Sequence, residues 1–113
     1  MQELPIINKI YEIYKSIVDI NNHLEKRWRY SLGTSLEDSI MLLIQEIIMA
    51  KNAPKPLKAI YLIKASSHLE IVTLKLRLLL ELNLTNETKI FQNQSKLNEV
   101  GRMLGGWLKS INT

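Results

Sequence analysis

The sequence contains no cysteine, and its seven aromatic residues make up only 6% of the chain. Without cysteine, neither a disulfide bond nor a thiolate metal site can form. Scarce aromatic residues combined with abundant Leu, Ile, Lys and Glu favour an all-helical fold over a β-sandwich. At 113 residues the chain is long enough for one domain, 1–113, whose core folds without disulfides.

Long uninterrupted apolar runs are also missing. The longest, from Ile71 to Leu84, contains Lys75, Arg77 and Glu81, so we expect no helix that spans a membrane. The N-terminal residues around Pro5 do not resemble a secretory signal. We therefore expect a cytoplasmic protein without a membrane partner.

Residue combinations typical of catalytic and metal sites are absent from the sequence. His23 and His68 fall on different predicted helices, and their nearest carboxylates, Glu25 and Glu70, lie two residues away. That spacing turns the carboxylate to another side of the helix. The Gly-Gly pair near the C-terminus does not follow a strand, as a nucleotide-binding loop would. We therefore expect no enzyme, no metal and no cofactor. A pair of histidine or carboxylate side chains facing one pocket would instead favour an enzyme.

Apolar residues recur every three or four positions in four stretches, which predicts helices over about residues 5–26, 32–52, 57–83 and 86–111. Pro5 suits the first turn of the first helix. Thr34 and Glu37 have capping-box spacing at the start of the second, and Ser31 offers an earlier start. Two prolines within residues 52–56 end it. Short connections predict an antiparallel up-down-up-down four-helix bundle.

Positive charge is concentrated in residues 51–77, which we call the basic segment. The net charge of the chain is +4, and this segment holds six basic side chains against one acidic side chain. Such a concentration indicates an anionic partner, such as RNA or DNA. The candidate nucleic-acid-binding residues of the basic segment are Lys55, Lys58, Lys64, Lys75 and Arg77.

The aromatic-basic cluster, residues 26–30, is predicted to be the first connection. Its cations Lys26, Arg27 and Arg29 alternate with Trp28 and Tyr30, a pattern that can neutralise phosphates and stack on bases. These cations are therefore a second candidate nucleic-acid-binding patch. The alternative is a loop whose rings cover the end of the bundle and whose cations are solvated, and short clusters more often have that role.

The third predicted helix carries apolar residues on two nearly opposite sides. One stripe, including Leu62, Val72 and Leu76, is expected to face the core. The second consists of Ile60, Ile63, Ile71, Leu74 and Leu78, which we call the α-stripe. A monomeric bundle needs only one stripe per helix, so the α-stripe is predicted to contact another subunit or a partner. Burial of both sides by the same chain is the alternative.

In the second predicted helix, Met41, Ile44 and Ile48 form a further stripe beside the core-facing residues. Only a narrow strip of this helix is expected to be exposed, namely Asp38, Gln45, Met49 and Asn52.

The closing segment, residues 99–109, follows a seven-residue repeat of apolar residues that is typical of helix packing in bundles. It also contains three glycines, each costing roughly 1 kcal/mol relative to alanine in a helix. Sequences keep such glycines where backbones approach closely, so we expect this segment to be an assembly element. Its candidate interface residues are Gly101, Arg102, Gly105, Gly106 and Trp107.

Four short motifs occur together in order along the chain. They are Leu4-Pro5-Ile6 with Lys9 and Tyr11, Leu32-Gly33, Leu76-Arg77-Leu78-Leu79, and the closing segment. The set closely resembles the accessory variability determinant (Avd) proteins of diversity-generating retroelements. These belong to a four-helix-bundle superfamily that includes the proteins encoded in ribosomal-RNA intervening sequences. The resemblance covers essentially the whole chain, and its closing Gly-Arg-x-Leu-Gly-Gly-Trp run is the most specific part.

The resemblance implies a small helical bundle that assembles as a ring-like homopentamer with a basic surface. It also implies association with the retroelement's reverse transcriptase and with RNA or DNA. In this role the protein supports the error-prone copying of template RNA into cDNA, without catalytic activity of its own. The alternative is a structural homo-oligomer of the intervening-sequence type, without a reverse transcriptase partner.

Overall fold

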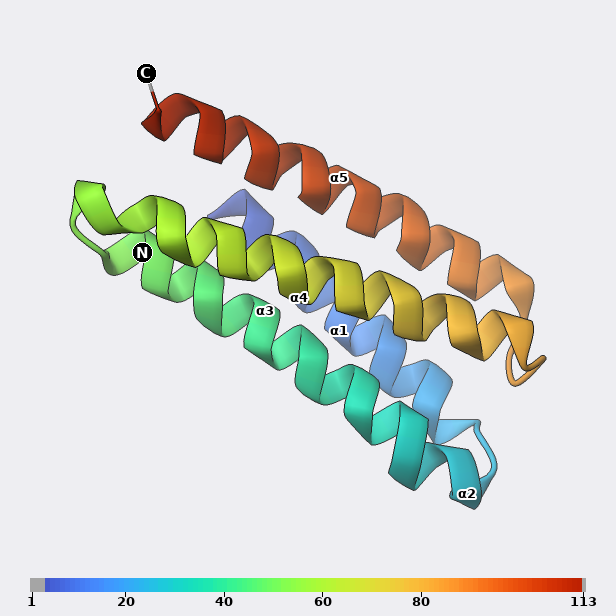
Figure 1. Ribbon diagram of the computed structural model, residues 1–113. Helices are drawn as coiled ribbons and strands as arrows, with labels where there is room; N and C mark the ends of the chain where they lie inside the picture. Colours follow the sequence, from blue (N-terminus) through green and yellow to red (C-terminus); the bar gives the residue numbers. More distant parts are fainter. Residues whose placement is uncertain (1–3, 113) are drawn as a thin grey trace.

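The computed structural model describes residues 4–112. Over this range the chain forms four long helices and no strands, as expected for an all-helical four-helix bundle (Figure 1). The long helices are α1 (Pro5–Asn22), α3 (Thr34–Asn52), α4 (Lys55–Glu81) and α5 (Glu87–Ile111). Helices α1 and α4 each pack against both α3 and α5, so the four helices surround one core. The bundle measures 46 × 26 × 21 Å.

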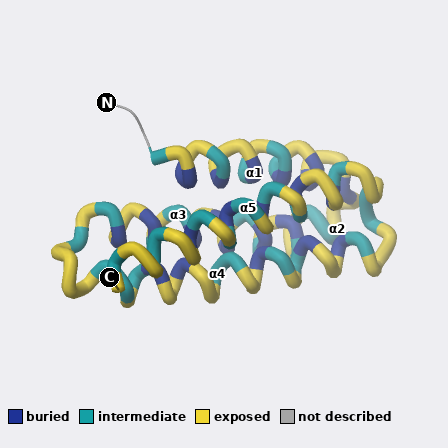
Figure 2. The backbone as a smooth tube through the Cα atoms, turned by 90° about the horizontal axis from the view of Figure 1, so that it is seen from above, coloured by how far each residue is buried: buried dark blue, intermediate teal, exposed yellow. Residues whose placement is uncertain are grey.

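The core is built from one stripe of aliphatic residues on each long helix, spaced three or four residues apart. This spacing puts the side chains on one side of a helix with 3.6 residues per turn, and Figure 2 shows these buried positions turned toward the interior. The fully buried examples include Ile10, Ile13, Ile17 and Ile20 of α1, Leu36, Ile40, Leu43 and Ile47 of α3, Leu62, Leu76 and Leu79 of α4, and Ile90 of α5. Leu97 and Leu104, which form the seven-residue repeat together with Ile90 and Ile111, are also buried.

The first connection differs from the sequence prediction. Helix α1 ends at Asn22 instead of near residue 26, and the aromatic-basic cluster is helical. It comprises α2 (Lys26–Trp28) and the first residues of the π-helix η1 (Arg29–Gly33), which leads directly into α3. The amide of Thr34 donates to the carbonyl of Arg29, five residues back. This wider turn breaks the regular helical period, so the stretch looks like a loop in sequence.

The start of α3 is held by Asn21 and not by a capping box. The hydroxyl of Thr34 donates to the Arg29 carbonyl at 3.0 Å and does not cap the helix. The buried Asn21 amide of α1 donates to the Gly33 carbonyl at 2.9 Å and to the Glu37 carboxylate at 2.7 Å. A Cβ atom at Gly33 would lie 3.0 Å from Asn21 Cγ. Gly33 is therefore needed so that the two helices can approach this closely.

The other two connections follow the predicted positions within two residues. Helix α4 begins at Lys55, before the predicted residue 57, because Pro56 is accommodated in the first turn, where no amide hydrogen bond is lost. The turn after α4 contains Asn83 in the left-handed region, with φ 56°. The side chain of Asn86 then accepts a hydrogen bond from the Lys89 amide and caps α5. None of the helices in residues 4–112 is long and apolar enough to cross a membrane.

Candidate nucleic-acid and assembly surfaces

Three of the predicted nucleic-acid-binding cations are hydrogen-bonded to the protein's own helices. The Arg29 guanidinium donates to the carbonyls of Asn22 and Leu24 at 3.1 and 3.2 Å, where α1 ends. The ammonium groups of the other two, Lys58 and Lys75, bond to α3. These hydrogen bonds fix the three side chains against the bundle and stabilise it.

The two lysines contact α3 at its two ends. Lys58 donates to the carbonyls of Ala50 and Lys51 at 2.8 and 3.0 Å, which satisfies acceptors at the C-terminus of α3. Lys75 donates to the Ser39 hydroxyl at 2.7 Å and, at 3.2 Å, to a carbonyl in the first turn of α3. These bonds join α4 to α3 across 7 to 40 residues of sequence.

The remaining predicted cations are exposed, namely Lys26, Arg27, Lys55, Lys64 and Arg77. The guanidinium of Arg27 lies 4.7 Å from the Trp28 ring centroid, and the ammonium of Lys64 lies 5.7 Å from that of Tyr61. Arg77 forms an exposed salt bridge with Glu81 at 3.1 Å. Exposed pairs of this kind are worth about 0–1 kcal/mol, so a phosphate can replace the carboxylate at little cost.

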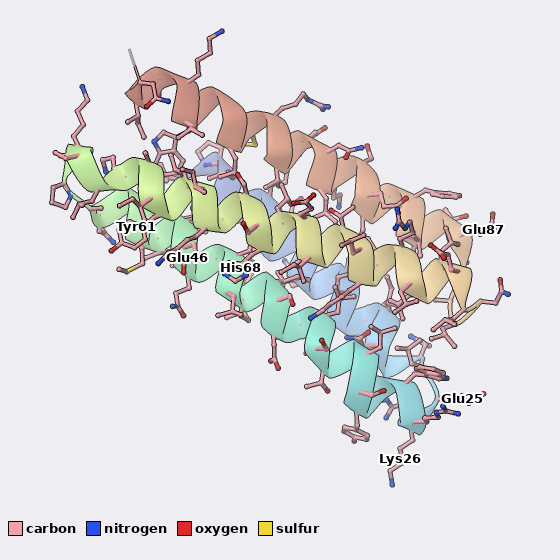
Figure 3. All side chains as sticks on the ribbon, in the orientation of Figure 1. Glu25, Lys26, Glu46, Tyr61, His68 and Glu87 are labelled. Atoms are coloured by element: carbon pink, nitrogen blue, oxygen red, sulfur yellow. The ribbon has the colours of Figure 1, made fainter. Side chains whose placement is uncertain are left out.

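These cations do not form a single patch. Figure 1 places α2 and the start of α4 at opposite ends of the bundle, and Lys26 is labelled at the α2 end in Figure 3. Helix α4 extends from one end toward the other, so Lys55, Lys64 and Arg77 are spread along the length of the molecule. An extended anionic polymer fits this arrangement better than a small anion.

The two rings of the aromatic-basic cluster have different environments. Trp28 is half-buried and packs against the core, so it covers the end of the bundle. Tyr30 is 68% exposed. Trp28 thus fits the interpretation in which the rings cover the end of the bundle. The Tyr30 ring is instead accessible for stacking on a base.

The α-stripe of α4 lies on the outside of the bundle. The exposed fractions of its side chains are 50% for Ile60, 57% for Ile63, 41% for Ile71, 50% for Leu74 and 42% for Leu78. Burial by the protein's own chain, the alternative from the sequence, is therefore wrong. Five half-exposed aliphatic side chains along one helix form the kind of patch that marks a contact surface.

A second exposed apolar surface lies on α3, where the sequence predicted only a narrow exposed strip with Met49 as its one apolar residue. Of the stripe predicted beside the core, only Ile44 packs against it. Met41, Leu42, Ile48 and Met49 are each 41–49% exposed, and we call these four residues the α3 patch. With Asp38, Ile44 and Gln45 they line a shallow groove of 540 Å³. The pairs of adjacent apolar residues at 41–42 and 48–49, seven apart, were the signal for a second surface.

The glycines of the closing segment have different surroundings. A Cβ atom at Gly101 would make an ordinary contact of 3.5 Å with the Leu69 side chain. At Gly105 and Gly106, both exposed, such a Cβ would meet no atom of the described residues within 4 Å beyond its chain neighbours and the local helix backbone. The bundle itself therefore does not require glycine at these two positions. The exposed Arg102 lies one helical turn before them.

Trp107 packs largely within its own protomer. The ring is half-buried and packs against the core. Together with Met103 it faces Leu4, Pro5 and Ile6 across a groove of 320 Å³. The first and last predicted motifs of the sequence therefore meet in space at this groove.

Two ion pairs join α1 to α5. Lys9 hydrogen-bonds to the Glu99 carboxylate, and Lys89 donates to the Asp19 carboxylate at 2.7 Å. The hydrogen bond and the charge of the lysine lower the pKa of Glu99 and likewise the pKa of Asp19. Glu99 of the closing segment is thus held by α1.

No group of three His, Cys, Asp or Glu side chains within residues 4–112 is placed to hold a metal ion. His23 lies at the end of α1, with Nδ1 2.8 Å from the Asp19 carbonyl. Figure 3 places Glu46 and His68 along the same α3–α4 boundary, but neither lines the 540 or the 320 Å³ groove.

Comparison with known proteins gives one family. No curated protein matches the chain. The family described as bAvd-like matches residues 4–111. That range includes all four long helices, the basic segment and the closing segment. Because the match spans nearly the entire sequence, the chain belongs to the bAvd-like family.

Proposed function

We propose that the protein is a non-catalytic accessory subunit of a diversity-generating retroelement. In this role it binds the element's reverse transcriptase and the template RNA or cDNA during mutagenic reverse transcription in the cytoplasm. Membership of the bAvd-like family over residues 4–111 is the observation that carries the proposal. The exposed cations and the two exposed apolar surfaces support it, because an accessory subunit needs surfaces for both kinds of partner.

The proposal includes self-assembly into a ring-like homopentamer of antiparallel bundles. The order of the α1–α5 ion pairs supports the antiparallel arrangement, because Lys9 pairs with the later Glu99 and Asp19 with the earlier Lys89. The α-stripe supports self-assembly, because contact with another copy would remove the exposed apolar area of its side chains from water, which is favourable. A ring of five copies would carry a net charge of about +20, which attracts nucleic acid more strongly than a single bundle does.

Within the nucleic-acid surface, we assign phosphate contact to the exposed cations Lys26, Arg27, Lys55, Lys64 and Arg77. Tyr30, with its exposed ring, is assigned to base stacking. Arg29, Lys58 and Lys75 contribute positive charge from positions fixed by their hydrogen bonds. Their replacement is therefore expected to affect the fold as well as binding.

The interaction with the polymerase is tested by co-expressing the protein with the reverse transcriptase encoded next to it and purifying the complex through a tag on the transcriptase. We expect the two proteins to co-purify. A chain that assembles into an oligomer but co-purifies with neither the transcriptase nor RNA would instead be a structural oligomer of the intervening-sequence type.

Nucleic-acid binding is tested by fluorescence anisotropy with a labelled single-stranded RNA between 50 and 200 mM salt, values chosen to span the range in which counterion release is steep. Each phosphate contact contributes about 0.7 to the slope of log affinity against log salt. Lys26→Glu with Arg27→Glu is expected to weaken binding and to lower the slope by about 1.4. The matched control, Lys15→Glu with Lys96→Glu, makes the same charge change outside both the assigned contacts and the closing segment. Equal losses in both variants, or an affinity independent of salt, would refute the assigned contacts.

A further inference from the structure

We propose that the α3 patch is the binding surface for the α-stripe of a second copy of this chain. Each protomer would then supply two different halves of the contact, one on α3 and one on α4. This inference deepens the self-assembly in the proposed function and rests on it. The sequence pointed to the α-stripe and the closing segment, and the α3 patch supplies an apolar surface complementary to the α-stripe.

Both surfaces are apolar and exposed, and their lengths are compatible. At 1.5 Å per residue the α3 patch, from Met41 to Met49, is about 12 Å long, whereas the α-stripe, from Ile60 to Leu78, is about 27 Å long. The patch therefore fits within the stripe. Two of its four residues are methionines, whose flexible side chains adapt to the shape of an opposing helix. The branched Ile and Leu side chains of the α-stripe provide ridges for such a contact.

The charges of the two helices favour a contact between α3 and α4 over a contact between two identical surfaces. Helix α3 carries three acidic residues and one cation, which lies in its last turn. Helix α4 carries five cations and two acidic residues. The net charge is therefore −2 for α3 and +3 for α4. The α3–α4 pairing brings helices of opposite net charge together, whereas a contact between two copies of either helix brings like net charges together, which selects against that pairing.

A contact between two different surfaces has a consequence for the assembly. When two copies bind, the first still has a free α-stripe and the second still has a free α3 patch. Further copies can therefore add by the same contact until the rotation between neighbouring copies closes a ring. A contact between two identical surfaces would stop at a dimer. The proposed pairing thus provides a physical route to a ring.

Two pairs of substitutions test the pairing. The α3 variant carries Met41→Asp and Met49→Asp, and the α4 variant carries Ile63→Asp and Leu74→Asp. All four side chains are 44–57% exposed, so the bundle is expected to fold. The control, Phe91→Asp with Ser95→Asp, changes an equally exposed apolar side chain on α5, outside both surfaces. If an aspartate variant fails to fold by circular dichroism, glutamine at the same positions takes its place.

The readout is molar mass by light scattering at micromolar concentration. We expect the unmodified chain and the control to assemble and each variant alone to be a monomer of 13.1 kDa. The two variants mixed in equal amounts should form a heterodimer of twice that mass, because one intact α3 patch meets one intact α-stripe.

Other results would overturn the inference. An α3 variant that still dimerises indicates pairing between α4 helices, and an α4 variant that still dimerises indicates pairing between α3 helices. Failure of the mixture to associate excludes the α3–α4 contact. An α3 variant that assembles normally but loses the reverse transcriptase assigns the α3 patch to that partner. An unmodified chain that is monomeric refutes the proposed self-assembly as well, whereas the earlier outcomes leave it standing.

Discussion

Replacing Gly33 with alanine is expected to destabilise the bundle, whereas the same replacement at Gly105 is expected to stabilise it. Both glycines lie in helical backbone with negative φ, so alanine fits the backbone at each position. The Cβ at Gly33 would lie 3.0, 3.1 and 3.3 Å from the three terminal atoms of the Asn21 side chain. At Gly105 the Cβ would meet no atom of the described residues within 4 Å beyond its chain neighbours and the local helix backbone. The difference between the two sites is therefore tertiary contact.

The magnitudes follow from two opposing effects. Alanine favours a helix over glycine by about 1 kcal/mol at either site. At Gly33 the added methyl group also overpacks a buried site, which costs about 1–3 kcal/mol. If Asn21 moves away, it loses hydrogen bonds to the Gly33 carbonyl and the Glu37 carboxylate, at about 1–3 kcal/mol each. After subtraction of the helix gain, we expect Gly33→Ala to lower the free energy of unfolding by about 0–2 kcal/mol if Asn21 stays in place and by about 1–5 kcal/mol if it moves away. Gly105→Ala should raise it by up to about 1 kcal/mol.

Urea denaturation monitored by circular dichroism measures both effects, preferably in the α4 variant so that assembly does not contribute. A double-mutant cycle isolates the clash, because Asn21→Ala removes the side chain that the new methyl group meets. In the Asn21→Ala background, Gly33→Ala should be neutral or stabilising. The reasoning is refuted if Gly33→Ala stabilises the original chain, or if the cycle shows no coupling between the two positions.

Three further predictions concern other contacts. The ion pairs lower the pKa values of Asp19 and Glu99 below their ordinary values of 3.8 and 4.5. Both pairs therefore stabilise the fold at a pH above the ordinary values, and this stabilisation is lost as the pH falls through the folded-state pKa values. Lys9→Met with Lys89→Met should therefore make thermal stability fall less between pH 7 and 3, and an unchanged pH profile would contradict this. Lys75→Met should lower the free energy of unfolding by about 1–2 kcal/mol, because Ser39 loses its charged donor; the control Lys64→Met should have little effect on urea denaturation. Gly105→Phe should reduce the molar mass of the assembly without unfolding the bundle, since the site is open within the protomer; unfolding with assembly retained in the surviving protein would count against it.

Of the eight predicted nucleic-acid-binding cations, five are exposed and three are hydrogen-bonded to the protein's own helices, and the sequence alone does not distinguish the two groups. The concentration of charge in residues 51–77 is a property of the sequence. Whether a lysine is available to a phosphate depends on its neighbours in space, and Lys75 differs from Lys64 because Ser39 lies across from it. A contact between residues 36 apart in sequence leaves no local pattern. The same reason explains why only Met49 of the α3 patch was predicted to be exposed.

The sequence by itself determined the four long helices and their core-facing sides, because apolar periodicity, prolines and the Asn86 cap act within one or two helical turns. It also carried the motifs that indicate the family. Only the tertiary structure decided that the aromatic-basic cluster is helical and which cations are held by the bundle. It also decided that Gly33 is required where Gly105 is not. Those features depend on which helices pack together, and packing brings together residues that no local pattern relates.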